Sequence, residues 1–411
     1  MMALGILAFV IAILLSVMFH EAGHFATAKL FGMKATQFFV GFGPTLWSRQ
    51  KGETEYGIKA IPAGGFVKII GMTPLEDVAP ADQARAFVNQ PGWQRFIVLV
   101  AGSTVHFVIA LVLLLILALG WPTHDTGNAR VATVFACASP SDSGSCAPGS
   151  TAAPAAGVLQ KGDVITAVNG RTVRDAVVPN PDPKAKAGST VKGGDAAAVS
   201  MIKASSGSVQ LTIERNGATQ NVSLTPVVVN GVHRVGIGTE PTFDRLGAVG
   251  AVGYSFRTFG AGVVGSFGAL GKVPTEIGNI FKSKPPARTV GGGGASVTSI
   301  VGVARVAGEG FSSAGLSGGI PTLIGIIASV NLFVGIFNLF PFLQLDGGHV
   351  AILGYEKVRN AWRRRRHLVA AGPVDLAKLM PFTYGVLAII VTVSALILFA
   401  DISNPVANPF N

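Results

Sequence analysis

Charged residues are scarce in this sequence of 411 residues: Asp, Glu, Lys and Arg together make up 13%, whereas hydrophobic residues make up 49%. A water-soluble globular protein carries about a quarter charged residues. The low charge therefore excludes an ordinary soluble globule. It indicates an integral membrane protein built around long apolar segments.

Four segments are long and apolar enough to span a bilayer, and we predict helices at Ala3–Phe19, Phe96–Gly120, Ile320–Phe342 and Phe382–Phe399. The first segment has no basic start and runs straight into His20–His24 without a small-residue cleavage site, so we expect a helix of the mature protein and not a secretory signal. No Lys or Arg precedes the first segment or follows the fourth, whereas the loops after the first and third segments are rich in both. The positive-inside rule then places these two loops in the cytoplasm and both termini outside.

Lys and Arg outnumber Asp and Glu by 32 to 21. This excess is concentrated in the two predicted cytoplasmic loops, where it faces anionic lipids, with the run Arg363–Arg366 as a topology anchor. We therefore expect anionic lipids as partners and no nucleic acid.

Cysteine is nearly absent, since only Cys137 and Cys146 occur, and both fall in a segment predicted to lie outside. An oxidising compartment permits a disulfide between them. Metal binding by this pair is the less favoured alternative, because no histidine lies close in sequence.

Against this apolar background stands the pentapeptide His20-Glu21-Ala22-Gly23-His24, at the end of the first apolar segment. On a helix, positions i and i+4 share a face, so both imidazoles can hold one zinc ion. Glu21 can then take a proton from a water on the metal. Ionisable residues are costly within a membrane and are usually functional there. The pattern predicts a zinc hydrolase embedded in the bilayer.

A second polar cluster, Asn338–His349, stands at the end of the third apolar segment. Catalytic zinc needs a third protein ligand, and Asp346 and His349 both compete for that role. The predicted topology brings this cluster to the same depth as His20 and His24. An alternative is that Asp346 only caps a turn.

The remaining chain contains β-prone stretches. Residues Phe38–Met72 predict glycine-punctuated hairpins, which must line a cavity or be covered by protein because open sheet edges cannot face lipid. The pairs Asn169-Gly170 and Asn216-Gly217 predict two hairpins in a small extracytoplasmic β-rich domain. We expect Leu246–Phe281 to be an amphipathic element at the outer interface and Gly291–Gly294 to be a flexible connector.

Several motifs together resemble the site-2 protease family of intramembrane zinc metalloproteases. They are HEAGH, Gly41–Pro44, the Ala63–Val67 loop and the N-x-x-P-x-x-x-x-D-G-G-H pattern of Asn338–His349. The likeness covers nearly the full chain and is nearest to the PDZ-containing bacterial branch, especially its actinobacterial members. One departure is His106, which replaces the amide of a Gly-Pro-x-x-Asn pattern that family members commonly show.

The resemblance implies a membrane α-helical fold with four transmembrane helices, a re-entrant β-hairpin and an inserted extracytoplasmic PDZ-like α+β domain. The expected parts are residues 1–120 (the HEAGH helix, β-loop and second span), 121–230 (the PDZ-like region), 231–319 (the interfacial segment and connector) and 320–411 (the third and fourth spans).

The resemblance also implies roles for individual residues. Zinc would be held by His20, His24 and Asp346, with Glu21 as general base. Asn338 and Asn331 would contact the substrate or oxyanion. An extended substrate would pair with Gly64, Gly65, Phe66 and Val67.

The implied function is hydrolysis of peptide bonds in or near the transmembrane segment of single-span proteins of the bacterial cytoplasmic membrane. Anti-sigma factors are the substrates expected from the resemblance. The alternative is a non-catalytic membrane sensor or scaffold that binds zinc.

Overall fold

The computed structural model describes the chain except residues 73–77, 139–145, 147–150, 182–187, 281, 283–287, 289–297, 370, 373, 375 and 407–411. The predicted connector Gly291–Gly294 therefore lies outside the described residues. The chain divides into two compact units, one made of Met1–Leu117 and Val249–Asn411 and the other of Ala118–Ala248.

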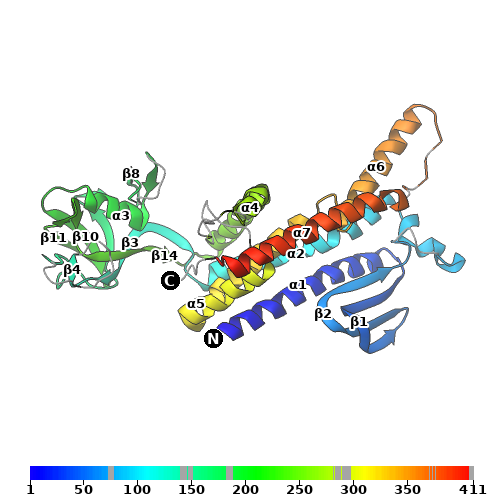
Figure 1. Ribbon diagram of the computed structural model, residues 1–411, viewed down its shortest axis with the longest axis horizontal. Helices are drawn as coiled ribbons and strands as arrows, with labels where there is room; N and C mark the ends of the chain where they lie inside the picture. Colours follow the sequence, from blue (N-terminus) through cyan, green and yellow to red (C-terminus); the bar gives the residue numbers. More distant parts are fainter. Residues whose placement is uncertain are drawn as a thin grey trace. The chain divides into compact units, whose positions relative to one another are not determined.

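Among the described residues, four helices are long and apolar enough to cross a membrane, as predicted: α1 (Met2–Leu30), α2 (Gly92–Gly120), α5 (Ile300–Asn338) and α7 (Met380–Ser403). Figure 1 shows α1, α2, α5 and α7 running in similar directions. Large apolar side chains such as Leu7, Ile11 and Leu15 remain exposed on α1. A helix that is apolar all round suits a lipid environment, and the chain is a multi-pass membrane protein.

The third span has different bounds from those predicted. Helix α5 begins at Ile300 instead of Ile320 and ends at Asn338, before Phe342. Ser299 caps the first turn by accepting a hydrogen bond from the amide of Gly302, at 3.3 Å. Gly315, with φ of 61°, interrupts the helix in a conformation that favours glycine. The many glycines of this stretch lower its intrinsic helix propensity, and the predicted third span did not include it.

Two further helices belong to the same unit. Helix α4 (Ala248–Ile280) forms where an amphipathic element was predicted. Helix α6 (Asp346–Arg365), between the third and fourth spans, was not predicted. Gly347 and Gly348 lie in the first turn of α6, where a Cβ would overlap the backbone of Leu339 and Phe342.

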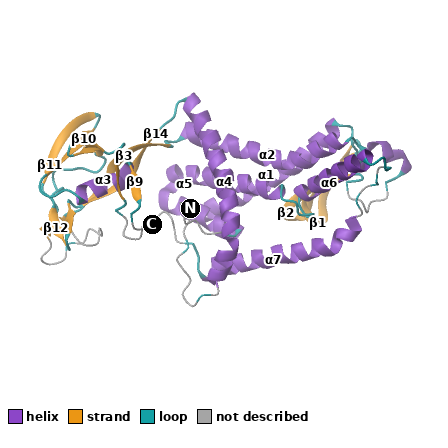
Figure 2. Cartoon of the chain, turned by 90° about the horizontal axis from the view of Figure 1, so that it is seen from above, coloured by secondary structure: helices purple, strands orange, loops and turns teal. Residues whose placement is uncertain are grey.

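Helix α7 is held mainly at its ends. Only 11% of its most apolar stretch is buried, and Figure 2 shows α7 lying apart from α1 and α2. Near its C-terminal end, the Asp401 carboxylate pairs with Arg288 at 2.7 Å and accepts a hydrogen bond from the amide of Ser299 at 2.6 Å. These contacts join α7 to the start of α5.

Between α1 and α2 lies the predicted β-structure, formed by β1 (Ala35–Lys51) and β2 (Thr54–Ile69). The two strands bend, so that Phe38 stands opposite both Val67 and Tyr56. The segment around Val67 is thereby an edge of the sheet, with β1 on one side. Short 3-10 helices η1 (Pro80–Arg85) and η2 (Phe87–Asn89) lead from the sheet to α2, and η4 (Leu376–Leu379) precedes α7.

The second unit is rich in antiparallel strands. Its main sheet has the order β11-β10-β6-β3-β14, and β7 pairs with β6. The predicted hairpins are present, with Asn169 and Asn216 in the left-handed region. A disulfide joins Cys137 and Cys146, whose Cα atoms are 5.6 Å apart. The elements of this unit are β3 (His124–Val134), β4 (Cys137–Ala138), β5 (Thr151–Ala152), β6 (Val164–Val168), β7 (Arg171–Thr172), β8 (Val177–Pro179), β9 (Thr190–Lys192), α3 (Gly194–Lys203), β10 (Val209–Arg215), β11 (Ala218–Leu224), β12 (Val227–Val229), β13 (Val232–Arg234) and β14 (Ile237–Asp244).

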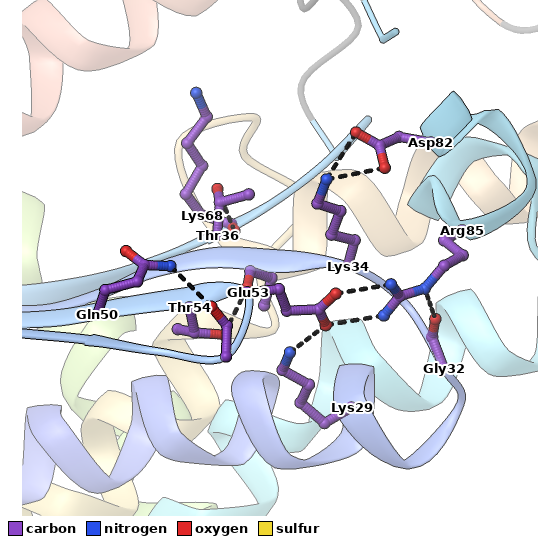
Figure 3. A network of polar contacts seen from close by, with 12 residues as sticks. Lys29, Gly32, Lys34, Thr36, Gln50, Glu53, Thr54, Lys68, Asp82 and Arg85 are labelled. Atoms are coloured by element: carbon purple, nitrogen blue, oxygen red, sulfur yellow. Dashed lines mark hydrogen bonds and ion pairs between the residues drawn. The ribbon is translucent and has the colours of Figure 1, made fainter. Parts of the chain in front are cut away.

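An ion-pair network holds the tip of the β1–β2 hairpin beside the end of α1 (Figure 3). Glu53 in the turn accepts two hydrogen bonds from the Arg85 guanidinium, at 2.6 and 2.7 Å, and another from Lys29. Arg85 also donates to the carbonyl of Gly32, at 2.9 Å. These bonds from Arg85, then Lys29, lower the pKa of the Glu53 carboxyl to about 2.

This network predicts a pH-dependent anchoring of the hairpin. The folded pKa of Glu53 is below its unfolded value, so its contribution is complete above about pH 4.5 and is lost as the pH falls toward about 2. Glu53→Gln should destabilise the hairpin by about 1 kcal/mol or less at pH 7, because the group is partly exposed. Amide hydrogen exchange of the two proteins should differ at pH 7 and converge at the acid end. A difference that persists unchanged at pH 2 would contradict this assignment.

Candidate metal centre

Helix α1 presents His20 and His24 on one face, as the i, i+4 spacing predicts. Both are buried, with 8% and 3% exposure, and their Nε2 atoms are 3.1 Å apart. Asp346, the first residue of α6, places its Oδ2 atom 3.3 Å from each of these nitrogens. Helices from distant parts of the chain thus bring three ligand atoms together. Among the described residues, His20, His24 and Asp346 form the cluster that could hold a metal ion.

The donor set fits a zinc ion. The Nδ1 atom of His24 lies 2.7 Å from the carbonyl oxygen of Val98, which can only accept, so Nδ1 carries the proton and Nε2 a lone pair. The Oδ2 atom of Asp346 is buried without a hydrogen-bond partner among the described residues. Lone pairs this close repel one another unless a cation lies between them. Tetrahedral zinc, with bonds of about 2.0–2.2 Å, separates its ligand atoms by about 3.3–3.5 Å.

The two histidines also pack tightly against α2. A Cβ atom on Gly102 would stand 2.5 Å from His24 Nε2 and 2.6 Å from His20 Nδ1. On α1, a Cβ on Gly23 would stand 2.9 Å from the Val105 side chain. Each helix therefore has a glycine where the other helix approaches it closely. The sequence pattern alone did not identify Gly102 as a site residue, although it opens the stretch Gly102–His106 in which this chain departs from the pattern that it otherwise resembles.

Glu21 faces the edge of β2. Its Oε2 atom accepts a hydrogen bond from the backbone amide of Val67, at 3.2 Å, and a Cβ on Gly65 would lie 3.6 Å from its side chain. Val67 also pairs with Phe38 of β1. The residues Gly64–Val67, predicted to pair with substrate, thus lie along an edge that passes beside Glu21.

The two predicted substrate-binding asparagines have different surroundings. Asn331 is 1% exposed, and its amide bonds His106, Ser16 and the Ile327 carbonyl. Asn338, the last residue of α5, is half-buried and its side chain has no hydrogen bond among the described residues. Its amide is therefore free to meet a ligand. Substrate contact by Asn331 stays a prediction.

Two helical histidines, a carboxylate from a distant helix and a glutamate beside the first histidine define an HExxH-type zinc hydrolase whose site is built on membrane-spanning helices. A sequence model of peptidase family M50 matches residues 8–382, and the chain belongs to this family. The zinc metalloprotease Rip1 of Mycolicibacterium smegmatis is 36% identical over 433 aligned positions, covering 99% of both chains. Rip1 of Mycobacterium tuberculosis strain H37Rv is 34% identical over 431 positions, with the same coverage.

These comparisons confirm the predicted resemblance to site-2 proteases and the prediction of a zinc-dependent peptidase. The chain is an intramembrane zinc metalloprotease.

Proposed function

We propose that this protein cleaves the transmembrane segments of single-span membrane proteins, with anti-sigma factors as the substrate class. His20, His24 and Asp346 would hold a zinc ion, which would activate water for hydrolysis. The observation that carries this proposal is the convergence of three buried lone-pair atoms within 3.3 Å, two of them on the apolar helix α1 and one at the start of α6. Family membership supports peptide hydrolysis at this site.

In this mechanism the bound zinc supplies a Lewis acid that acidifies water and polarises a carbonyl group. Glu21 takes one proton from the water whose oxygen attacks the carbonyl carbon of the scissile bond. It then returns a proton to the leaving nitrogen as the C–N bond breaks. Asn338, with its free amide, donates a hydrogen bond to the oxygen that gains negative charge.

The edge of β2 orients the substrate. A helical substrate keeps its carbonyls in internal hydrogen bonds, so it must unwind before the attack. The Gly64–Val67 edge offers replacement backbone bonds beside Glu21, which offsets part of the cost of unwinding. Binding of an extended segment here requires the Val67 amide to exchange its bond to Glu21, at 3.2 Å, for one to the substrate.

Reconstitution tests the proposed substrate class. Purified protein and a candidate single-span anti-sigma factor are placed in one proteoliposome, and products are identified by mass spectrometry. We expect a cut within or next to the substrate's transmembrane segment, loss of the product on zinc chelation and its return when zinc is restored. Cleavage confined to a soluble tail, or unaffected by chelation, would refute the proposal.

The charge distribution supports an orientation with both termini and the Ala118–Ala248 unit outside the cytoplasm. We propose that this unit is PDZ-like and filters substrates by the bulk of their ectodomains. Its ends lie together, because the Thr123 amide donates to the Asp244 carbonyl at 3.0 Å. A short Gly-Ser linker can therefore replace residues 124–243.

The variant in which the linker replaces residues 124–243 should cleave a substrate with an intact ectodomain at least about tenfold faster than the full chain, because a filter acts by excluding bulky ectodomains. A trimmed substrate, as the matched control, should be cleaved equally by both proteins. If the variant without residues 124–243 is folded and zinc-loaded but cleaves neither substrate, the unit is instead a docking module for peptides.

We propose anionic lipids as partners of α6. Figure 1 shows α6 projecting away from α1 and α2. Tyr355, Val358 and Trp362 form an exposed stripe along it, with exposures of 58%, 71% and 51%. The exposed run Arg364–Arg366 follows, and the Arg366 guanidinium lies 4.1 Å from the centre of the Trp362 ring. Aromatic and basic residues on one exposed helix suit a lipid interface rich in phosphate.

Replacing Arg364, Arg365 and Arg366 by Gln should weaken the binding of phosphatidylglycerol by about 1 kcal/mol per charge. Native mass spectrometry of protein from mixed nanodiscs measures the lipid retained. Replacing Lys161, Lys192 and Lys203 of the β-rich unit by Gln removes the same charge and should leave lipid retention unchanged. An equal loss of retained lipid in both variants would show that lipid binding depends only on the net charge of the protein.

A further inference from the structure

A buried chain of polar side chains crosses three helices next to the metal centre. His106 on α2 is 2% exposed, and its Nδ1 atom lies 2.8 Å from Oδ1 of Asn331 on α5. Asn331 Nδ2 is 2.9 Å from the Ile327 carbonyl and 3.1 Å from Oγ of Ser16 on α1. The Ser16 hydroxyl in turn donates to the Ala12 carbonyl, at 2.9 Å.

The backbone carbonyls of Ala12 and Ile327 fix the direction of every hydrogen bond among these side chains. The carbonyls of Ala12 and Ile327 can only accept, so the Ser16 hydroxyl and the Asn331 amide nitrogen are donors. Asn331 therefore turns its oxygen toward His106, whose Nδ1 must carry the proton. A neutral His106 then has its lone pair on Nε2, and Nε2 has no hydrogen bond among the described residues.

His20 requires a hydrogen-bond acceptor for its Nδ1 proton. As a zinc ligand through Nε2, it carries its proton on Nδ1, and ligating histidines almost always donate that proton to an acceptor. Nδ1 of His20 is buried, and within the described part of the chain it has no hydrogen-bond partner. The centres of the His20 and His106 rings are 5.0 Å apart. Two imidazoles joined by an N–H···N bond of ordinary length have ring centres about 5 Å apart.

We infer that His106 is a positioning residue: in the zinc-loaded protein its Nε2 accepts the Nδ1–H of His20, a contact that ring rotations bring about. The network through Asn331 and Ser16 holds His106 in the required tautomer. Zinc affinity thereby depends on a residue of α2 that does not touch the metal. This inference rests on the proposed ligand set.

The test measures zinc affinity by competition with a chelator and the visible spectrum of the Co²⁺-substituted protein, so neither readout depends on activity. His106→Phe keeps a ring but loses the acceptor, and the zinc Kd should rise about 10–100-fold with an altered Co²⁺ spectrum. His106→Gln keeps an acceptor and should restore affinity to within about threefold. Ser16→Ala, at the far end, should also bind within about threefold, because Asn331 stays fixed by the Ile327 carbonyl.

Wild-type zinc affinity in a folded His106→Phe protein would overturn the inference, and so would an equal loss in Ser16→Ala. If His106→Phe fails to fold because Asn331 is left unpaired, the double variant His106→Phe/Asn331→Leu removes both polar groups and decides instead. Failure of the ligand set is distinguished by His20→Ala: if that protein binds zinc normally, the proposed metal site is wrong, whatever the His106 variants do.

Discussion

Gly102→Ala should severely weaken zinc binding in an otherwise folded protein. The added methyl group would stand 2.5 Å from His24 Nε2 and 2.6 Å from His20 Nδ1, closer than any side chain tolerates. Both imidazoles belong to α1, which is packed against α2, so they must rotate away from the metal. We expect the zinc affinity to fall at least about 100-fold, beyond the usual effect of residues that only orient ligands. Metal analysis of purified protein, equilibrated with buffered zinc, measures the loss.

Gly120→Ala is the matched control for this substitution. Gly120 lies on the same helix, and a Cβ there has no atom within 4 Å. Both changes replace a helical glycine by a better helix former, which favours the helix by about 1 kcal/mol. Only Gly102→Ala should lose zinc and, with it, peptidase activity. Normal zinc content in the Gly102→Ala protein would contradict the close approach of α2 to the metal centre.

The linear motifs of the chain predicted two members of the metal cluster and left two candidates for the third. His20 and His24 follow from helical spacing, and a carboxylate at membrane depth has few explanations other than a metal or a partner charge. Choosing Asp346 over His349 depended on the family resemblance. The structure brings Asp346 Oδ2 to 3.3 Å from both histidines, whereas His349 is not part of the cluster.

Features that depend on tertiary packing were not predictable. Gly102 resembles any glycine of an apolar helix until α1 lies against it. Helix α6 was missed because it depends on tertiary contacts: its first turn packs against the preceding loop, and Leu353 further along packs near Met33 and Val98. Local propensity carries no information on such contacts, and the glycines in the first half of α5 lowered its predicted helix propensity. The bonds of Asn331 likewise exist only once three helices meet.

Glu21→Gln should separate catalysis from metal binding. The amide has the shape of the carboxylate, and its oxygen can still accept the hydrogen bond from Val67 that Glu21 accepts at 3.2 Å. It cannot take up a proton from water, so the turnover number should fall by about 10²–10⁴-fold. The three ligands His20, His24 and Asp346 are unchanged, and the zinc content should therefore remain that of the wild type.

Initial rates in proteoliposomes, normalised to zinc content, give this comparison. Glu55→Gln makes the same substitution on strand β2, where Glu55 accepts a hydrogen bond from Gln37 at 3.1 Å, and should change the rate by no more than about twofold. A Glu21→Gln protein that cleaves at the wild-type rate would remove Glu21 from the reaction. If the Glu21→Gln protein is slow and has also lost its zinc, Glu21 is needed for metal binding. The amide would then have failed to preserve the geometry around the two histidines.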